Sequence, residues 1–114
     1  MPGFDGGGNG EDEERLRDVA RRYNKDFVAL NGFRIPFELL KKVPVELMFR
    51  FNFVPLEETD DGKLAVAIAD PSQLLMIDEI ALLLKRSVVT KVSTLKQISD
   101  TLKRTEELQR RMYE

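Results

Sequence analysis

The 114-residue sequence contains no cysteine and no histidine. Without cysteine, the chain has no disulfide, no thiolate metal ligand and no thiol nucleophile. Without histidine, it lacks the commonest general base near neutral pH and the commonest nitrogen ligand of zinc. Catalytic triads and the usual zinc sites are therefore excluded, and only carboxylate, lysine or tyrosine chemistry remains.

Long apolar runs and an excess of charge of one sign are also missing. The longest uninterrupted apolar run is 64–69, far shorter than the roughly 20 residues of a membrane-spanning helix. The 18 basic and 20 acidic residues leave a net charge of -2, so no broad positive field attracts nucleic acid or anionic lipid. The N-terminus also lacks the basic and apolar regions of a secretory signal. We therefore expect a cytoplasmic protein that inserts into no membrane and binds no nucleic acid.

The glycines gather at the N-terminus, where five of the seven fall within residues 1–10. This composition predicts a disordered lead. It does not predict a phosphate-binding loop, because Gly10 is followed by acidic Glu11 rather than by the lysine of a Walker A motif.

The length of the chain and its composition, 42% hydrophobic and 33% charged residues, are sufficient for one compact domain. Residues 11–35 are expected to form an N-terminal helix and a short strand over 26–30. Residues 36–105 are expected to form the core, and 106–114 an exiting helix or linker. The core pattern predicts, in order, short helices at 36–42 and 44–51, a hairpin over 53–69, a helix at 71–85, a strand at 87–92 and a helix from Thr94.

These elements predict an α+β fold. The sheet is expected to be small, mostly antiparallel and three-stranded, built from the hairpin plus a crossover strand, with helices packed on it. Asp70, directly before Pro71, is expected to cap the 71–85 helix.

Candidate catalytic groups are weak throughout the chain. The acidic pairs Glu57-Glu58 and Asp60-Asp61 fit a strand and a turn better than an enclosed acid/base pair. The basic doublets are scattered and balanced by nearby acids, which is typical of solvated helix faces. We therefore assign no catalytic, cofactor-binding or metal-binding residue.

Leu75 and Leu82 stand out, because they lie seven residues apart on the polar side of the 71–85 helix. They form either an exposed docking ridge or a surface covered by the N-terminal segment. Internal cover is slightly favoured, and it would move the partner-binding surface to Arg17, Arg21 and Arg22 on the first helix.

A longer pattern runs through the core. It comprises Val43-Pro44, Phe53-Val54-Pro55-Leu56, Asp61 to Pro71 (DGKLAVAIADP), an Ile77-Asp78-Glu79-Ile80 helix, a valine strand and a closing helix. In this order the stretch from Val43 to Tyr113 resembles the N-terminal domain of type II secretion and type IV pilus assembly ATPases, the secretion-ATPase N-terminal family.

The resemblance implies a non-catalytic docking module. Its partner would be the cytoplasmic domain of an inner-membrane platform protein, with the ATPase core in the same longer chain or in a separate subunit. The protein would then be peripheral to the inner membrane through its partners.

One branch of that family binds cyclic di-GMP through paired arginine-leucine-glycine motifs. Here Arg15-Leu16 matches the start of one motif, Arg17 stands in place of the glycine, and no second copy follows. Because the resemblance includes this branch, a cyclic di-GMP-sensing regulatory domain is the alternative function, although the motif is incomplete.

Overall fold

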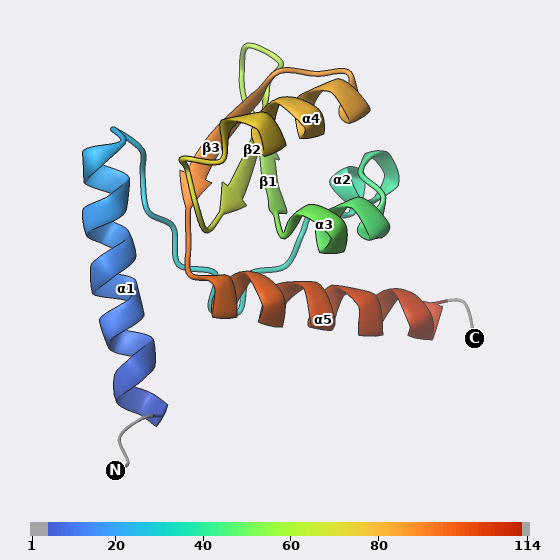
Figure 1. The fold of residues 1–114 in the computed structure, drawn as a ribbon. Coiled ribbons are helices and arrows are strands. Elements are labelled where there is room, and N and C mark those ends of the chain that lie inside the picture. Colours follow the sequence, from blue (N-terminus) through green and yellow to red (C-terminus); the bar gives the residue numbers. More distant parts are fainter. Residues whose placement is uncertain (1–4, 113–114) are drawn as a thin grey trace.

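The computed structural model describes the backbone of residues 5–112 and the side chains of residues 12–111. Helices surround a three-stranded sheet. In Figure 1, α4 lies above the sheet and α5 runs beneath it. The elements in chain order are α1 Asp5–Arg22, α2 Phe37–Lys42, α3 Val45–Phe51, β1 Val54–Glu58, β2 Leu64–Ile68, α4 Leu74–Leu84, β3 Val88–Val92 and α5 Leu95–Met112.

The sheet contains the hairpin and the crossover strand that the sequence predicts. Strands β1 and β2 form an antiparallel hairpin, and β3 pairs in parallel with β2 after the crossover through α4. The hairpin turn closes where Thr59 donates its amide to the Lys63 carbonyl at 2.8 Å, and Gly62 takes the positive φ of 84° that this turn requires. The predicted α+β fold class is confirmed.

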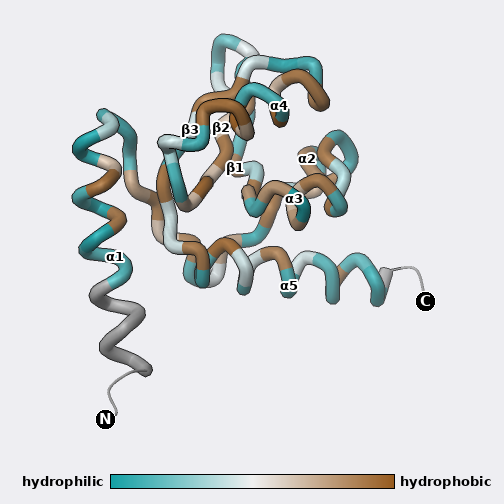
Figure 2. Tube along the Cα trace, in the orientation of Figure 1, coloured by the Kyte–Doolittle hydropathy of each residue, from teal (hydrophilic) through white to brown (hydrophobic). Residues whose placement is uncertain are grey.

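Strand β2 is the centre of the molecule. All five of its residues are fully buried, because it pairs on both edges and both of its faces are covered. This explains the continuous apolar run of the sequence, which is typical of a strand with no wet face. Figure 2 shows hydrophobic residues along β2 and over most of α4. The largest fully buried side chains outside β2 are Phe53, Leu30, Met48, Ile80, Ile98 and Leu102.

The two short helices start where proline permits a helix to start. Pro36 and Pro44 precede α2 and α3, and each accepts the first hydrogen bonds of its helix through its carbonyl. Asn52 caps the C-terminus of helix α3. Its left-handed φ of 53° stops the helix directly before buried Phe53. Both predicted helices are confirmed.

Helix α1 packs against strand β3. Its buried Leu16 and Ala20 form a small cluster with Val92. The expected strand over 26–30 is reduced to one parallel bridge between Phe27 and Val92. The predicted disordered lead covers residues 1–10. Residues 1–4 lie outside the described residues, and α1 begins at Asp5, six residues before the predicted helix start at Glu11.

Helix α5 begins as predicted. The Thr94 hydroxyl accepts a hydrogen bond from the Gln97 amide at 3.1 Å, and so caps the first turn. The helix then continues without a break to residue 112. It thus includes the described part of 106–114, the stretch expected to be an exiting helix or linker, and residues 113–114 lie outside the described residues. Thr105 is still buried, and the side chains at 106–108, 110 and 111 are exposed.

The side chain of Gln97 joins α5 to two distant segments. Its Oε1 accepts a hydrogen bond from the buried Leu30 amide at 2.7 Å, and its Nε2 donates to Glu13 of α1 at 2.6 Å. Only 4% of Gln97 is exposed. Since a buried backbone amide without a partner is costly, this residue fixes how the segment after α1 lies against the core.

We predict that Gln97→Ala lowers the free energy of unfolding by about 1–3 kcal/mol, because it leaves the buried Leu30 amide unpaired. Urea unfolding followed by circular dichroism measures this change. The matched control is Gln109→Ala on the same helix, where the side chain is only half-buried. Equal midpoints for the two variants would contradict the role given to Gln97.

Candidate functional site

Helix α4 presents two apolar faces, of which only one faces the core. On the inner side Ile80 is buried, and Met76, Ile77 and Leu84 pack against the core. On the outer side Leu74, Leu75 and Leu82 are 66%, 85% and 76% exposed. We call these three residues the α4 leucine face. Leu75 and Leu82 lie two turns apart, so they line up along the helix.

The expectation that the N-terminal segment covers this line is wrong. Helix α1 lies beside β3, on the far side of the sheet from β1 (Figure 1), and its narrow apolar stripe is used against Val92 and Phe27. The described residues thus leave the leucines open to solvent. Asp78, Glu79 and Lys85 are also exposed, so charged side chains of both signs accompany the leucine face.

The arginines predicted on the first helix are exposed but partly engaged. Arg17 stacks over the ring of Phe27, with its Cζ 4.4 Å from the ring centroid, and lies 3.9 Å from Glu13. Arg21 forms an ion pair with Asp18. Arg22 is exposed at the end of the helix. The structure therefore places the arginines on α1, apart from the α4 leucine face.

A small polar cavity lies beside these arginines, between the end of α1 and the segment that bridges to β3. Its volume is about 440 Å³, and its lining includes four cations and one acid: Arg17, Arg21, Lys25, Lys91 and Asp26. Lys91 and Asp26 face each other at 3.8 Å, so part of this charge is already neutralised.

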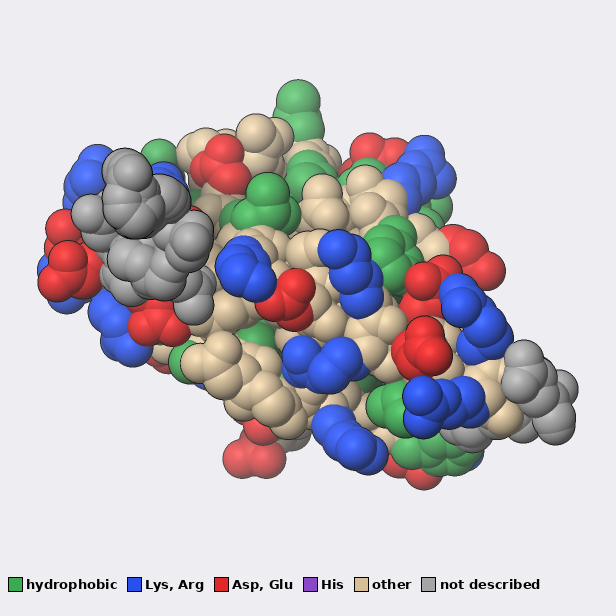
Figure 3. All heavy atoms as spheres, turned by 90° about the horizontal axis from the view of Figure 1, so that it is seen from below, with side chains coloured by type: hydrophobic (Ala, Val, Ile, Leu, Met, Phe, Trp, Pro, Cys, Tyr) green, Lys and Arg blue, Asp and Glu red, His purple; other side chains and the backbone are tan. Residues whose placement is uncertain are grey.

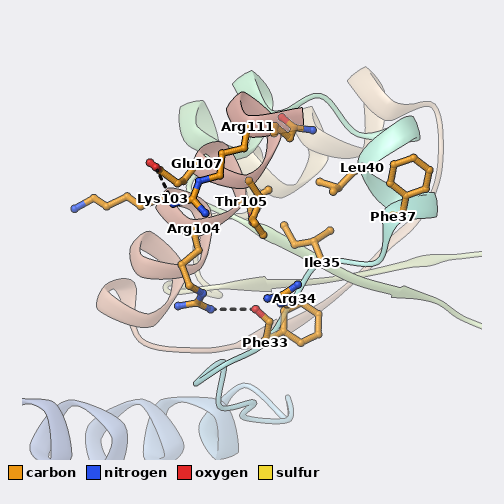
Figure 4. Close-up of a pocket in the computed structure, with 12 residues that line it drawn as sticks. Phe33, Arg34, Ile35, Phe37, Leu40, Lys103, Arg104, Thr105, Glu107 and Arg111 are labelled. Atoms are coloured by element: carbon orange, nitrogen blue, oxygen red, sulfur yellow. Dashed lines mark hydrogen bonds and ion pairs between the residues drawn. The ribbon is translucent and has the colours of Figure 1, made fainter. Parts of the chain in front are cut away.

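Sequence reasoning missed a second cavity, which we call the α2–α5 groove. It has a volume of about 580 Å³ and lies between the segment 33–37, α2 and the second half of α5. Figure 4 shows Phe33, Ile35, Phe37 and Leu40 on one wall, with Lys103, Arg104, Thr105 and Arg111 on the other. The only signal in the sequence is the loss of a regular apolar stripe after Leu102, which leaves room beside the helix.

The acidic pairs occupy turns and ion pairs at the surface. Arg86 donates to Glu58 at 2.5 Å, and together with Lys42 it lowers the pKa of that carboxyl group below its ordinary value. The Thr59 hydroxyl likewise lowers the pKa of Asp61. A general acid needs a raised carboxyl pKa instead. Within the described part of the chain, no group of three or more acidic side chains is placed to hold a metal ion.

Asp70 does not cap the helix as predicted. Its carboxylate accepts hydrogen bonds from the amide and the hydroxyl of Ser72, at 3.0 and 2.6 Å, which lower its pKa. Gln73, without a capping side-chain bond, stands at the N-cap of α4. The correction has a local cause, because residues 70–73 close a turn through the bond from the Gln73 amide to the Asp70 carbonyl. Asp70 therefore stabilises the turn that leads into α4.

No helix among the described residues combines the length and the apolar character needed to cross a bilayer.

A family model described as the MshEN domain matches residues 15–112. No curated protein matches the chain. Among solved structures, MshE with cyclic di-GMP has a TM-score of 0.69 at 18% identity, covering 79% of this chain and 65% of that chain. Two crystal forms of the XpsE N-terminal domain have TM-scores of 0.69 and 0.64 at 22% and 20% identity, covering 82% and 84% of this chain. At these identities the likeness shows a shared fold, and this chain spans 65% of the length of each of those chains.

We predict that Leu75→Ser combined with Leu82→Ser leaves the thermal midpoint nearly unchanged, because exposed leucines contribute little to folding. The matched control is Ile80→Ala in the same helix, which removes a fully buried side chain and should cost about 2–5 kcal/mol. Differential scanning calorimetry compares the three proteins. A double variant that melts as early as the Ile80 variant would show that the leucine face is covered.

Proposed function

This chain belongs to the MshEN domain family, which confirms the resemblance to N-terminal domains of type II secretion and type IV pilus ATPases, and we propose that it is a non-catalytic docking module that couples such an ATPase to its membrane platform. The α4 leucine face is the observation that carries this proposal. The module would perform no chemistry itself. Its task would be to bind a partner in a fixed orientation relative to the motor.

The chemistry of α4 supports protein binding. Three leucines, each more than 60% exposed, lie on the outer side of α4, and the fold does not need them for its own core. Apolar patches with a polar rim mark sites of protein–protein contact. In such interfaces a few central apolar residues commonly carry most of the affinity. Leu75 and Leu82 would be those central residues, and Asp78 and Glu79 would belong to the rim.

The proposed partner is the cytoplasmic domain of the inner-membrane platform protein of the same secretion or pilus system. The ATPase core would follow in the same longer chain or act as a separate subunit. In this arrangement the protein is cytoplasmic and is held at the inner membrane through its partner, with no insertion of its own and no nucleic-acid binding.

The arginines of α1 fit a secondary role in this proposal. Arg17 and Arg21 already have intramolecular partners in Phe27 and Asp18. Exposed ion pairs of this kind contribute little energy, and rim charges mainly affect the rate of association. Arg17, Arg21 and Arg22 would therefore steer the partner, whereas the leucine face would hold it.

A cyclic di-GMP-sensing regulatory domain is the alternative, and a structure of MshE contains that ligand. In this chain the matching arginine is Arg15, which pairs with Asp12 at 2.8 Å. Arg15 does not line the polar cavity beside α1. These contacts favour docking over nucleotide sensing.

We predict that Leu75→Ser with Leu82→Ser weakens binding to the platform cytoplasmic domain by about thirtyfold or more, since losing central apolar anchors commonly costs about 2 kcal/mol. Isothermal titration calorimetry with the purified platform domain measures the affinity. Arg21→Glu with Arg22→Glu should change the affinity less and its salt dependence more.

The control for docking is Tyr23→Ser with Leu95→Ser, which removes two apolar side chains that are 47% and 54% exposed elsewhere on the surface. This control should bind like the unmodified domain. Docking through α4 is contradicted if the control and the leucine variant lose affinity equally, or if only the arginine variant loses it.

For the alternative function, we predict that cyclic di-GMP binds no more tightly than about 1 mM, the level of weak non-specific contact. Calorimetric titration of the domain with the dinucleotide decides this. Micromolar affinity that disappears in Arg15→Ala would make the domain a sensor.

A further inference from the structure

The α2–α5 groove combines an apolar floor with a basic edge. Phe37 lies at the start of α2 and is 57% exposed, and Leu108 on α5 is 39% exposed. Both belong to the lining of the same cavity of about 580 Å³. Large apolar side chains left open in a concave surface provide a place for an apolar group from outside.

The charges around the groove are strongly unbalanced. Its lining holds four cations, Arg34, Lys103, Arg104 and Arg111, against the single acid Glu107. Glu107 is already shared between Arg111 at 3.7 Å and Arg110 at 4.0 Å. The local excess of positive charge occurs in a protein whose net charge is -2. Figure 3, the view from below onto α5, shows the Lys and Arg side chains gathered along the middle of this face.

The positions of the polar groups distinguish between kinds of ligand. The two polar groups that are held in place are already used, because Arg104 donates to the Phe33 carbonyl at 3.0 Å and the Thr105 hydroxyl donates to the Thr101 carbonyl at 2.8 Å. A small molecule needs several fixed polar groups to orient it. Arg111 is paired with Glu107. The other two cations, Arg34 and Lys103, are exposed side chains suited to carboxylates spread along an extended partner.

From this geometry we propose that the α2–α5 groove binds an acidic peptide segment of a partner protein, with one large apolar side chain seated between Phe37 and Leu108. Carboxylates elsewhere on the segment would face Arg34 and Lys103. The complementary charge would attract and orient the segment, and burial of the anchor would supply most of the affinity. This site lies beside α5 and is separate from the α4 leucine face, so it does not depend on the proposed docking function.

The test uses a phage-displayed library of random dodecapeptides selected on the full chain. We expect the selected peptides to combine several Asp or Glu residues with one large apolar residue. Fluorescence anisotropy of a labelled selected peptide should show binding that weakens as the ionic strength rises. Selection of basic or purely apolar peptides, or no selection at all, would overturn the proposal.

Three variants locate the binding. Arg34→Glu with Lys103→Glu changes two exposed side chains and should weaken peptide binding about tenfold or more, with an unchanged thermal midpoint. Phe37→Ala should have an effect of similar size without any change of charge. Arg22→Glu with Lys25→Glu is the matched control, since it makes the same charge change at the end of α1 and should leave binding unaltered.

Other occupants would give different results and would overturn the proposal. Binding to phosphatidylglycerol vesicles that Arg34→Glu with Lys103→Glu abolishes would assign the groove to a lipid surface. A concentration-dependent dimer that the same variant dissociates would assign it to a second copy of the chain. Peptide binding should instead persist in Leu75→Ser with Leu82→Ser, which would show that this site is independent of docking through α4.

Discussion

The arrangement of this domain depends on the hydrogen bonds of the buried side-chain amide of Gln97. Its Oε1 accepts from the Leu30 amide, 67 residues away in the sequence, and its Nε2 donates to Glu13, 84 residues away. Because both partners belong to the N-terminal part of the chain, one side chain on α5 determines where that part lies. The buried side-chain amide finds both hydrogen-bond partners in this arrangement. It therefore favours this packing over other packings that bury a similar apolar surface.

This arrangement protects the sheet edge and leaves α4 open. The segment after α1 lies along the outer edge of β3, where the Val28 amide donates to the Val92 carbonyl and the Val92 amide donates to the Asp26 carbonyl, each at 2.8 Å. An uncovered strand edge invites pairing with other chains. The N-terminal part of the chain therefore covers β3, and none of its described residues covers the α4 leucine face. The fold thus covers the β3 edge of its sheet but leaves three leucines exposed on one helix. This is consistent with a domain that keeps the leucine surface for a partner.

Most features that local patterns determine were predicted from the sequence, whereas the contacts between distant segments were not. Patterns of a few residues predicted the two short helices, the hairpin and the start of the last helix at Thr94, and all of these elements are present. Asp70 was misassigned because its carboxylate has a nearer partner in Ser72. Three features depend on which distant segments pack together, and helical periodicity does not report that. They are the exposure of Leu75, the side-chain hydrogen bonds of Gln97 and the α2–α5 groove.

We propose that a preformed domain docks through the outer face of α4. The decisive measurement is chemical-shift mapping by nuclear magnetic resonance, in which the labelled domain is titrated with the platform cytoplasmic domain. We expect the largest amide shifts within residues 74–85, while the side-chain amide signals of Gln97 stay in place. Largest shifts on α1 and β3, or displacement of the Gln97 signals on binding, would contradict it.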